Sequence, residues 1–202
     1  MILVGGDTGS EAGWDHDPPA KRKVTPFGVL VLLTGALTLV FGEGGSSDFW
    51  ADALMAWWRS ARSSYRGIKR LVIYLDNGPE NSGRRTQFLK RMVQFADWSG
   101  LAVRLVYYPP YHSKYNPIER CWSSLEKKWS GVLLNCWEVI LQCAARMTWR
   151  KMRPRVERLP GSYATKVRVP AEEMKAYNAR LERSATLPKY DITITPRKPR
   201  GR

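Results

Sequence analysis

The sequence predicts an α/β fold, in which helices pack on the faces of a sheet. Apolar, β-favouring runs alternate along the chain with segments whose apolar residues recur at three- and four-residue steps. The chain has 202 residues, of which 44% are hydrophobic. This length and composition are typical of a globular protein with one sizeable core.

The predicted elements follow one another as strand, strand, helix, strand, helix, strand, helix, helix. Residues 6–26 are rich in Gly, Asp and Pro and predict a loop. The apolar window 27–42 is too short to span a membrane and is interrupted by Thr34-Gly35, so it favours a β-hairpin. The expected strands are 27–34, 37–42, 71–76 and 101–108, and the expected helices are about 48–64, 84–98, one from Asn116, 135–148 and a short one near 171–183.

The composition changes near residue 150. Residues 1–150 contain all the predicted strands, whereas residues 151–202 are basic and interrupted by prolines. We therefore predict a domain over 1–150 and a basic, partly flexible C-terminal extension over 151–202, with one short helix.

The charge of the chain indicates the class of partner. Lys and Arg number 33 and Asp and Glu number 18, for a net charge of +15. Such an excess favours a polyanion, and nucleic acid before a membrane surface. A solvated basic face without a partner stays open as the alternative. The three cysteines form no CxxC pair or zinc-ligand pattern, and the N-terminus shows no signal peptide, so we expect a cytoplasmic protein with reduced thiols.

Two acidic residues stand at positions suited to chemistry. Asp76 ends a predicted strand, and ligands in α/β sheets gather at the carboxyl ends of strands. Glu119 lies in the first turn of the helix that begins near Asn116, after the next strand. Two neighbouring carboxylates repel each other unless one is protonated or a metal lies between them. Mg²⁺ suits such oxygen ligands, and two ions can stabilise the attacking and leaving oxygens of a phosphodiester.

Each of these residues also has a structural interpretation. Asp76-Asn77-Gly78 is a turn sequence, in which an Asp often bonds to its own backbone. Asn-Pro-Ile-Glu at 116–119 is a variant of the capping box. His112 in a loop is also consistent with a solvated side chain, and the tryptophans Trp50, Trp57, Trp58, Trp122 and Trp129 are most simply core residues.

Two longer blocks of sequence resemble a known family. LDNGPENSGRRTQF, which contains Asp76, and YYPPYHSKYNPIERCW, which contains Glu119, are similar to the second and third signature blocks of DDE transposases from bacterial insertion sequences. They resemble the branch related to mariner-like elements. Asp76 and Glu119 are 43 residues apart, which fits that branch. Weaker similarity extends over roughly residues 15–190.

The resemblance implies an RNase H-like fold, a five-stranded mixed sheet with helices on both sides. It also implies a triad of two aspartates and a glutamate that binds two Mg²⁺ (or Mn²⁺) ions and catalyses DNA strand cleavage and transfer. Asp76 and Glu119 would be the second and third acids. The residues expected to line the site or contact DNA are Asn77, Arg84, Arg85, His112, Ser113, Lys114, Asn116 and Arg120.

The chain departs from the family pattern at its start. The family's first aspartate lies on the opening strand, of which Met1–Gly5 resembles only the end, and the N-terminal helix-turn-helix region is missing. We therefore expect a truncated transposase with little or no activity, which binds transposon ends and target DNA. The alternatives are a basic DNA-binding module that does not cut, or another RNase H-like nuclease. A shortened strand is expected to weaken the sheet edge and to favour self-association, for example as a homodimer.

Overall fold

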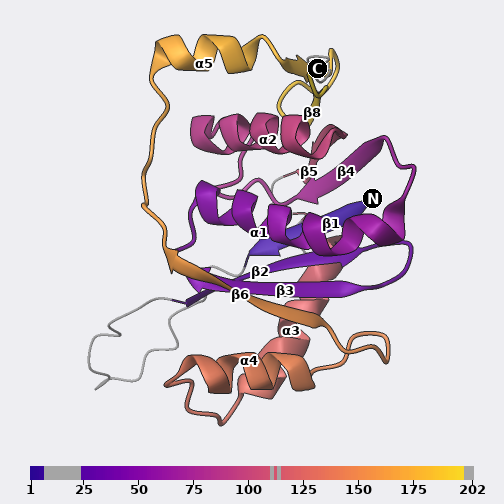
Figure 1. Cartoon of the computed structure of the whole chain (residues 1–202), viewed down its shortest axis with the longest axis vertical. Coiled ribbons are helices and arrows are strands. Elements are labelled where there is room, and N and C mark those ends of the chain that lie inside the picture. Colours follow the sequence, from indigo (N-terminus) through magenta and orange to yellow (C-terminus); the bar gives the residue numbers. More distant parts are fainter. Residues whose placement is uncertain (7–23, 110–111, 113–114, 198–202) are drawn as a thin grey trace.

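One eight-stranded mixed sheet organises the chain, in the order β6-β3-β2-β1-β4-β5-β8-β7 (Figure 1). The computed structural model describes residues 1–6, 24–109, 112 and 115–197. The strands are β1 (Ile2–Gly6), β2 (Val24–Val31), β3 (Leu37–Glu43), β4 (Arg70–Leu75), β5 (Ala102–Tyr107), β6 (Arg155–Ser162), β7 (Leu181–Arg183) and β8 (Asp191–Ile194). The helices are α1 (Ser47–Ala61), α2 (Thr86–Ser99), α3 (Pro117–Trp129), α4 (Trp137–Arg146) and α5 (Ala171–Asn178), with a 3₁₀ turn at Arg62–Tyr65.

The first five strands form the centre of the sheet and have mixed directions. β1, β2 and β3 are antiparallel neighbours, whereas β1, β4 and β5 are parallel to one another. Helices lie on both faces, with α1 and α2 on one side and α3 on the other (Figure 1). This five-stranded mixed sheet with flanking helices confirms the predicted RNase H-like fold class.

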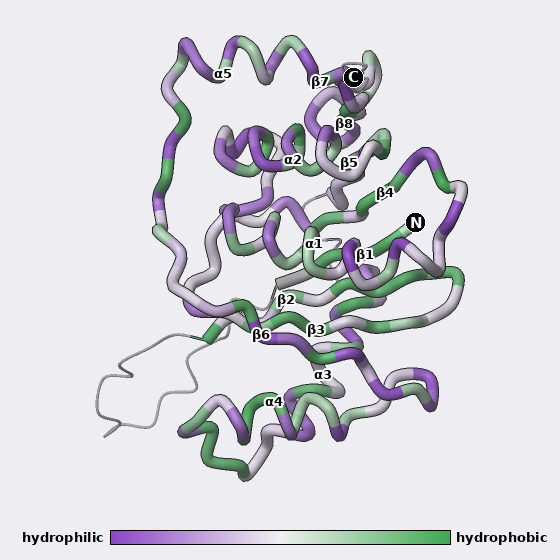
Figure 2. The backbone as a smooth tube through the Cα atoms, viewed as in Figure 1, coloured by the Kyte–Doolittle hydropathy of each residue, from purple (hydrophilic) through white to green (hydrophobic). Residues whose placement is uncertain are grey.

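Two apolar clusters, one on each face, hold the layers together. The larger joins α1 and α2 to the strands, and the smaller joins α3 and α4 to β2 and β3. Figure 2 shows the hydrophobic residues concentrated along the central strands. The tryptophans expected in the core are buried at 50, 57, 58 and 122, and Trp129 is half-buried against Phe41.

Most predicted elements are present, with shifted ends. The window 27–42 forms the β2–β3 hairpin, and none of the helices in the described part of the chain is long and apolar enough to cross a membrane. The helix expected through residue 64 ends at Ala61 because a 3₁₀ turn follows it, and the helix expected from 84 begins at Thr86 because a turn precedes it. The loop expected over 6–26 is wrong at its ends, since Gly6 belongs to β1 and Val24 begins β2; residues 7–23 lie outside the described residues.

The weakened sheet edge expected at the opening strand is wrong. β1 lies between β2 and β4, so it is an interior strand, and the two strands at the ends of the described sheet are β6 and β7. All five residues of β1 pair with β2. The position of β1 therefore gives no reason to expect self-association, which stays a prediction.

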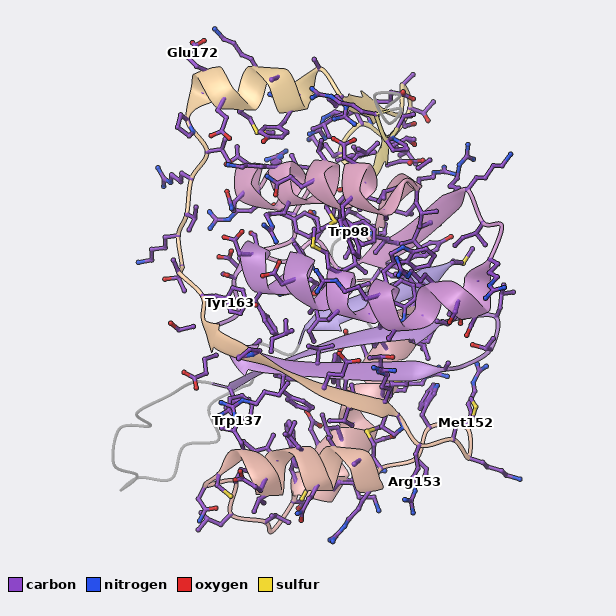
Figure 3. The ribbon with its side chains drawn as sticks, viewed as in Figure 1. Trp98, Trp137, Met152, Arg153, Tyr163 and Glu172 are labelled. Atoms are coloured by element: carbon purple, nitrogen blue, oxygen red, sulfur yellow. The ribbon has the colours of Figure 1, made fainter. Side chains whose placement is uncertain are left out.

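The C-terminal residues add three strands to the sheet. β6 pairs in parallel with β3, β8 pairs antiparallel with β5, and β7 pairs with β8. Trp137 of α4 lies beneath β6, where the Arg158 guanidinium stacks 4.0 Å from its ring (Figure 3). The sequence predicted only the short helix here, and that helix ends at Asn178 because residues 181–183 form β7. The division at residue 150 stays a prediction.

Candidate active site

Asp76 directly follows β4, the strand that lies between β1 and β5 in the sheet. Leu71, Ile73 and Leu75 alternate along β4 and are buried in the α1–α2 cluster, whereas Tyr74 packs against the α3 cluster. The side chain of Asp76 is half-buried.

The loop after β4 is held together by two asparagine side chains. Asn77 adopts a φ of 62°, a left-handed conformation that asparagine tolerates better than most residues, and its Oδ1 accepts a bond from the Gly83 amide at 3.4 Å. Asn81 donates from Nδ2 to Oδ1 of Asp76 at 2.7 Å. The turn interpretation of Asp76 expected a bond to its own backbone, and the bond found here is to a side chain.

Asn81 is a site residue that the sequence reasoning missed. Its side chain is buried, with 1% of its surface exposed, and its Oδ1 has no hydrogen-bond partner among the described residues. A buried polar atom without a hydrogen-bond partner is unfavourable for folding. The sequence offered one indication of its role, since Asn81 is an amide within the block LDNGPENSGRRTQF, five residues after Asp76.

Glu119 lies in the first turn of α3, and the sequence fixes where that helix begins. Asn116 is fully buried and caps the helix, since its Oδ1 accepts a bond from the Ile118 amide at 3.4 Å. The Glu119 amide donates to the Asn116 carbonyl at 3.0 Å. The capping role that the sequence suggested for Asn116 is thus present, and the half-buried Glu119 keeps its carboxylate for other contacts.

The packing of α3 and the strand register relate the start of that helix to the central strands. α3 packs closely on β2 at Gly28, where an added Cβ would lie 2.7 Å from the Trp122 ring and 3.0 Å from Ile118. Gly28 pairs with Gly5 of β1. Ile2 of β1 pairs with Ile73 of β4, and Leu3 pairs with Tyr74; the same register, continued for two residues, would set Gly5 level with Asp76. The start of α3 is thus packed on β2, two strands away from β4 in the sheet.

No third acid joins this pair in the described residues. The β1 residue that this register would set level with Asp76 is Gly5, which has no side chain. Among residues 1–6, 24–109, 112 and 115–197, no group of three or more His, Cys, Asp or Glu is arranged to hold a metal ion. Asp7, Asp15 and Asp17 lie outside the described residues.

The charges of the two acids affect buried neighbours. Burial raises the pKa of the Tyr107 hydroxyl, Arg183 lowers it, and Asp76 raises it further. Burial also raises the pKa of the Cys121 thiol to about 12, with Arg150 lowering it and Glu119 raising it. All three cysteines are free thiols, as the sequence predicted.

The basic residues predicted to contact DNA differ in their surroundings. Arg84 and Arg120 are exposed, whereas Arg85 is half-buried and forms a salt bridge with Glu80 at 3.2 Å. His112 is exposed, with its ring 5.7 Å from that of Tyr115. Ser113 and Lys114 lie outside the described residues. Arg85 thus has a structural contact of its own, which its sequence position did not reveal.

The fold and this pair of acids are the combination expected of a DDE transposase domain. The family model described as Rhodopirellula transposase DDE domain matches residues 6–196. The chain therefore belongs to this family of DDE transposase domains.

The chain is also similar to part of one solved structure. The cryoEM structure of the simian T-cell lymphotropic virus intasome, in complex with PP2A regulatory subunit B56 gamma, contains a chain that is 16% identical, with a TM-score of 0.46. The alignment covers 83% of the present chain and 59% of the viral complex's chain, so the chain spans less than two thirds of that relative. No curated protein matches the chain.

Proposed function

We propose that the chain is a transposase catalytic domain that cleaves DNA strands and joins them to a target, slowly and with a divalent metal ion. The observation that supports this best is that Asp76 follows a central strand and Glu119 lies in the first turn of a helix packed on the same sheet, within a chain of the DDE transposase family. We also assign it to the branch related to mariner-like elements, on the wording of the two signature blocks.

The donor set present fits a divalent ion. Mg²⁺ uses one or two protein carboxylates and completes its shell with water and phosphate oxygens. Asp76 and Glu119 are the residues that would hold it. When bound, such an ion makes water a better nucleophile and stabilises negative charge on phosphate oxygens.

The other residues of the site orient the acids and bind the substrate. Asn81 fixes the direction of the Asp76 carboxylate through its hydrogen bond, and Asn116 fixes the start of α3 and so the position of Glu119. The DNA backbone is bound by the predicted donors: Asn77, Arg84, Arg85, the 112–114 loop and Arg120. On this proposal, water attacks the phosphorus of a phosphodiester and the 3′-oxygen of the DNA leaves as a 3′-hydroxyl. In the joining step this 3′-hydroxyl attacks a phosphodiester of the target, and the 3′-oxygen of the target strand leaves in turn.

A second candidate is a DNA-binding module that does not cut. The net charge of +15 favours this candidate. It is also favoured by Gly5, because the β1 residue that the strand register would set level with Asp76 has no carboxylate. Phosphate contacts alone would give binding that is strongly salt-dependent, independent of metal and with little sequence preference.

A nicking assay on supercoiled DNA with Mn²⁺ tests the proposal. The parent chain is compared with Asp76→Asn, with Glu119→Gln, and with Glu126→Gln as a matched control. Glu126 lies exposed on the same helix. We expect slow nicking by the parent and the control, and a loss of at least about tenfold in each site variant, since removal of a metal ligand or its partner costs this much or more.

Two outcomes would contradict the catalytic proposal. If no chain nicks DNA but all retard it on a gel containing EDTA, the second candidate is correct. If Asp76→Asn nicks as fast as the parent, the activity does not depend on this site.

A further inference from the structure

A pocket of about 240 Å³ lies where the loop after β4 meets the segment between β7 and β8. Its lining consists of Asn77, Ser82, Gly83, Arg84, Lys189 and Tyr190. Asn77 is the residue after Asp76, so the pocket adjoins the candidate active site. Lys189 and Tyr190 come from the C-terminal segment, to which the sequence assigned no site.

The polar side chains around the pocket can all donate hydrogen bonds, and none of them is a carboxylate. Arg84 and Lys189 are exposed, and neither has an ion pair within the described part of the chain. Because Oδ1 of Asn77 already accepts the Gly83 amide, its amide nitrogen is the group left to donate. Two cations and several neutral donors suit an anionic ligand.

Contacts on both sides keep the pocket walls together. Arg183 donates to the Gly83 carbonyl at 2.9 Å and to the Pro188 carbonyl at 3.0 Å, which joins the two walls. The Tyr107 amide also donates to the Tyr190 carbonyl at 2.8 Å. An added Cβ at Gly83 would lie 3.3 Å from the Lys189 carbonyl oxygen, so the two walls approach each other closely here.

A second, larger pocket shows what distinguishes this one. It has a volume of about 350 Å³ and is lined by Arg70, Arg104 and Arg183, but also by Glu182 and Asp191. Arg104 forms a two-point hydrogen bond with Asp191 there. Its positive charge is therefore largely neutralised, whereas that of Arg84 and Lys189 is not.

We propose that the Arg84–Lys189 pocket binds one backbone phosphate of DNA, next to the phosphate that lies at Asp76. This inference rests on the proposed function and names a contact made by the C-terminal segment. The volume is below the roughly 300–1,000 Å³ of pockets that enclose whole small ligands, so it suits a phosphate group that belongs to a longer chain. Arg84 and Lys189 bind the phosphate oxygens, and Arg183 is a positioning residue that sets the distance between them.

The test compares two double variants of the full chain that lose the same charge. Arg84→Gln/Lys189→Gln removes the pocket cations, and Arg66→Gln/Lys69→Gln removes an exposed arginine and lysine that precede β4, at the opposite end of that strand from Asp76. Binding of a fluorescein-labelled DNA duplex of mixed sequence is measured by anisotropy, in EDTA and over a range of salt concentrations. Circular dichroism confirms that both variants are folded.

We expect the pocket variant to bind about tenfold more weakly at low salt and to reduce the slope of log K against log salt by about one to two. The matched control, Arg66→Gln/Lys69→Gln, is expected to change the affinity for DNA less than about threefold, because it alters only the overall electrostatic potential of the protein. Arg84→Lys/Lys189→Arg, which keeps both charges, is expected to restore most of the binding.

Two other outcomes would contradict the inference, and they differ in whether the proposed function fails as well. If both double variants bind equally well while the parent nicks DNA, the pocket inference is wrong and the proposed function stands. If the parent does not bind DNA at all, the proposed function and the inference that rests on it both fail.

Discussion

The side chain of Asn81 donates a hydrogen bond to the carboxylate of Asp76, with 2.7 Å between Nδ2 and Oδ1. Asn81 is itself held by its backbone, since its amide donates to the Gly78 carbonyl at 3.3 Å. A buried amide thus fixes the acid at the end of β4 in one orientation. This relationship links the conformation of the loop to the chemistry of the site.

Asn81→Ala is expected to weaken both folding and metal binding. It removes a hydrogen bond to a charged acceptor, so we expect a loss of about 1.5–3 kcal/mol in the free energy of unfolding. Loss of a partner that orients a metal ligand should also lower Mn²⁺ affinity by about 10–100-fold. Urea denaturation and electron paramagnetic resonance of free Mn²⁺ measure the two effects.

The exposed Asn135, which precedes α4, provides the control for this substitution. Asn135→Ala is expected to leave both quantities unchanged. An Asn81→Ala variant with the parent's Mn²⁺ affinity would contradict a role in orienting Asp76.

Gly28→Ala is expected to disturb the packing of α3 on the sheet. The new Cβ would lie 2.7 Å from Cη2 of Trp122, which is closer than side-chain atoms normally approach. We expect the free energy of unfolding to fall by about 1–3 kcal/mol, the usual cost of overpacking. Because Glu119 is on the same helix, Mn²⁺ affinity should fall as well. A variant that unfolds at the parent's urea midpoint would show that the helix has room to move.

Tyr107→Phe is expected to stabilise the protein. The Tyr107 hydroxyl is buried and has no hydrogen-bond partner among the described residues, so the substitution removes an uncompensated polar group. We expect a gain of about 1 kcal/mol at pH 7 in urea denaturation. A loss of stability would mean that the hydroxyl is bound in solution.

The same substitution should also remove part of the alkaline instability. Burial raises the pKa of Tyr107 above its ordinary value of about 10. The unfolded chain then releases this proton at a lower pH than the folded chain does, so stability falls as the pH rises above about 10. The difference between Tyr107→Phe and the parent should therefore grow from pH 9 to pH 11.

Asp97→Asn is expected to change stability in a pH-dependent way. Asp97 of α2 accepts two hydrogen bonds from Arg180 and one from the Arg197 amide, and these bonds, chiefly that of Arg180, lower its pKa. A lowered pKa stabilises the fold above the ordinary value of about 4, and this contribution is lost as the pH falls through the lowered value. We expect the variant to be less stable by up to about 1 kcal/mol at pH 7, since Asp97 is partly exposed.

Thermal unfolding at a series of pH values measures this contribution. The variant and the parent are expected to converge as the pH falls from about 4 through the lowered pKa of Asp97, because both then carry an uncharged group at position 97. A difference that stays constant down to the lowest pH at which both chains fold would assign the effect to packing instead.

The central elements could be predicted because local pattern and burial agree there. The β2–β3 hairpin has long apolar runs around a glycine turn, and β4 is an apolar run followed directly by an acid and turn residues. β6 was missed because most of it is exposed and it contains Pro160-Gly161, which usually mark a turn. β8 alternates correctly but has only four residues, too few for periodicity to identify.

Within the signature blocks, the sequence pattern indicated candidate site residues only at the ends of predicted elements. Asp76 and Glu119 stand at element ends that the pattern itself locates. Asn81 is an amide in a loop, where no periodicity indicates burial. Lys189 and Arg84 line the same pocket because β8 pairs with β5, and the local sequence does not indicate such a long-range pairing.

The order of the strands has a consequence for synthesis on the ribosome. β6 covers the free side of β3, and β8 with β7 covers the free side of β5, yet all three are among the last residues to be translated. Until then, the nascent chain presents two open strand edges at once, which are ready templates for pairing with other chains. A premature stop codon after α4 would leave the acids of the site in place and expose both edges permanently, so its product should accumulate in inclusion bodies.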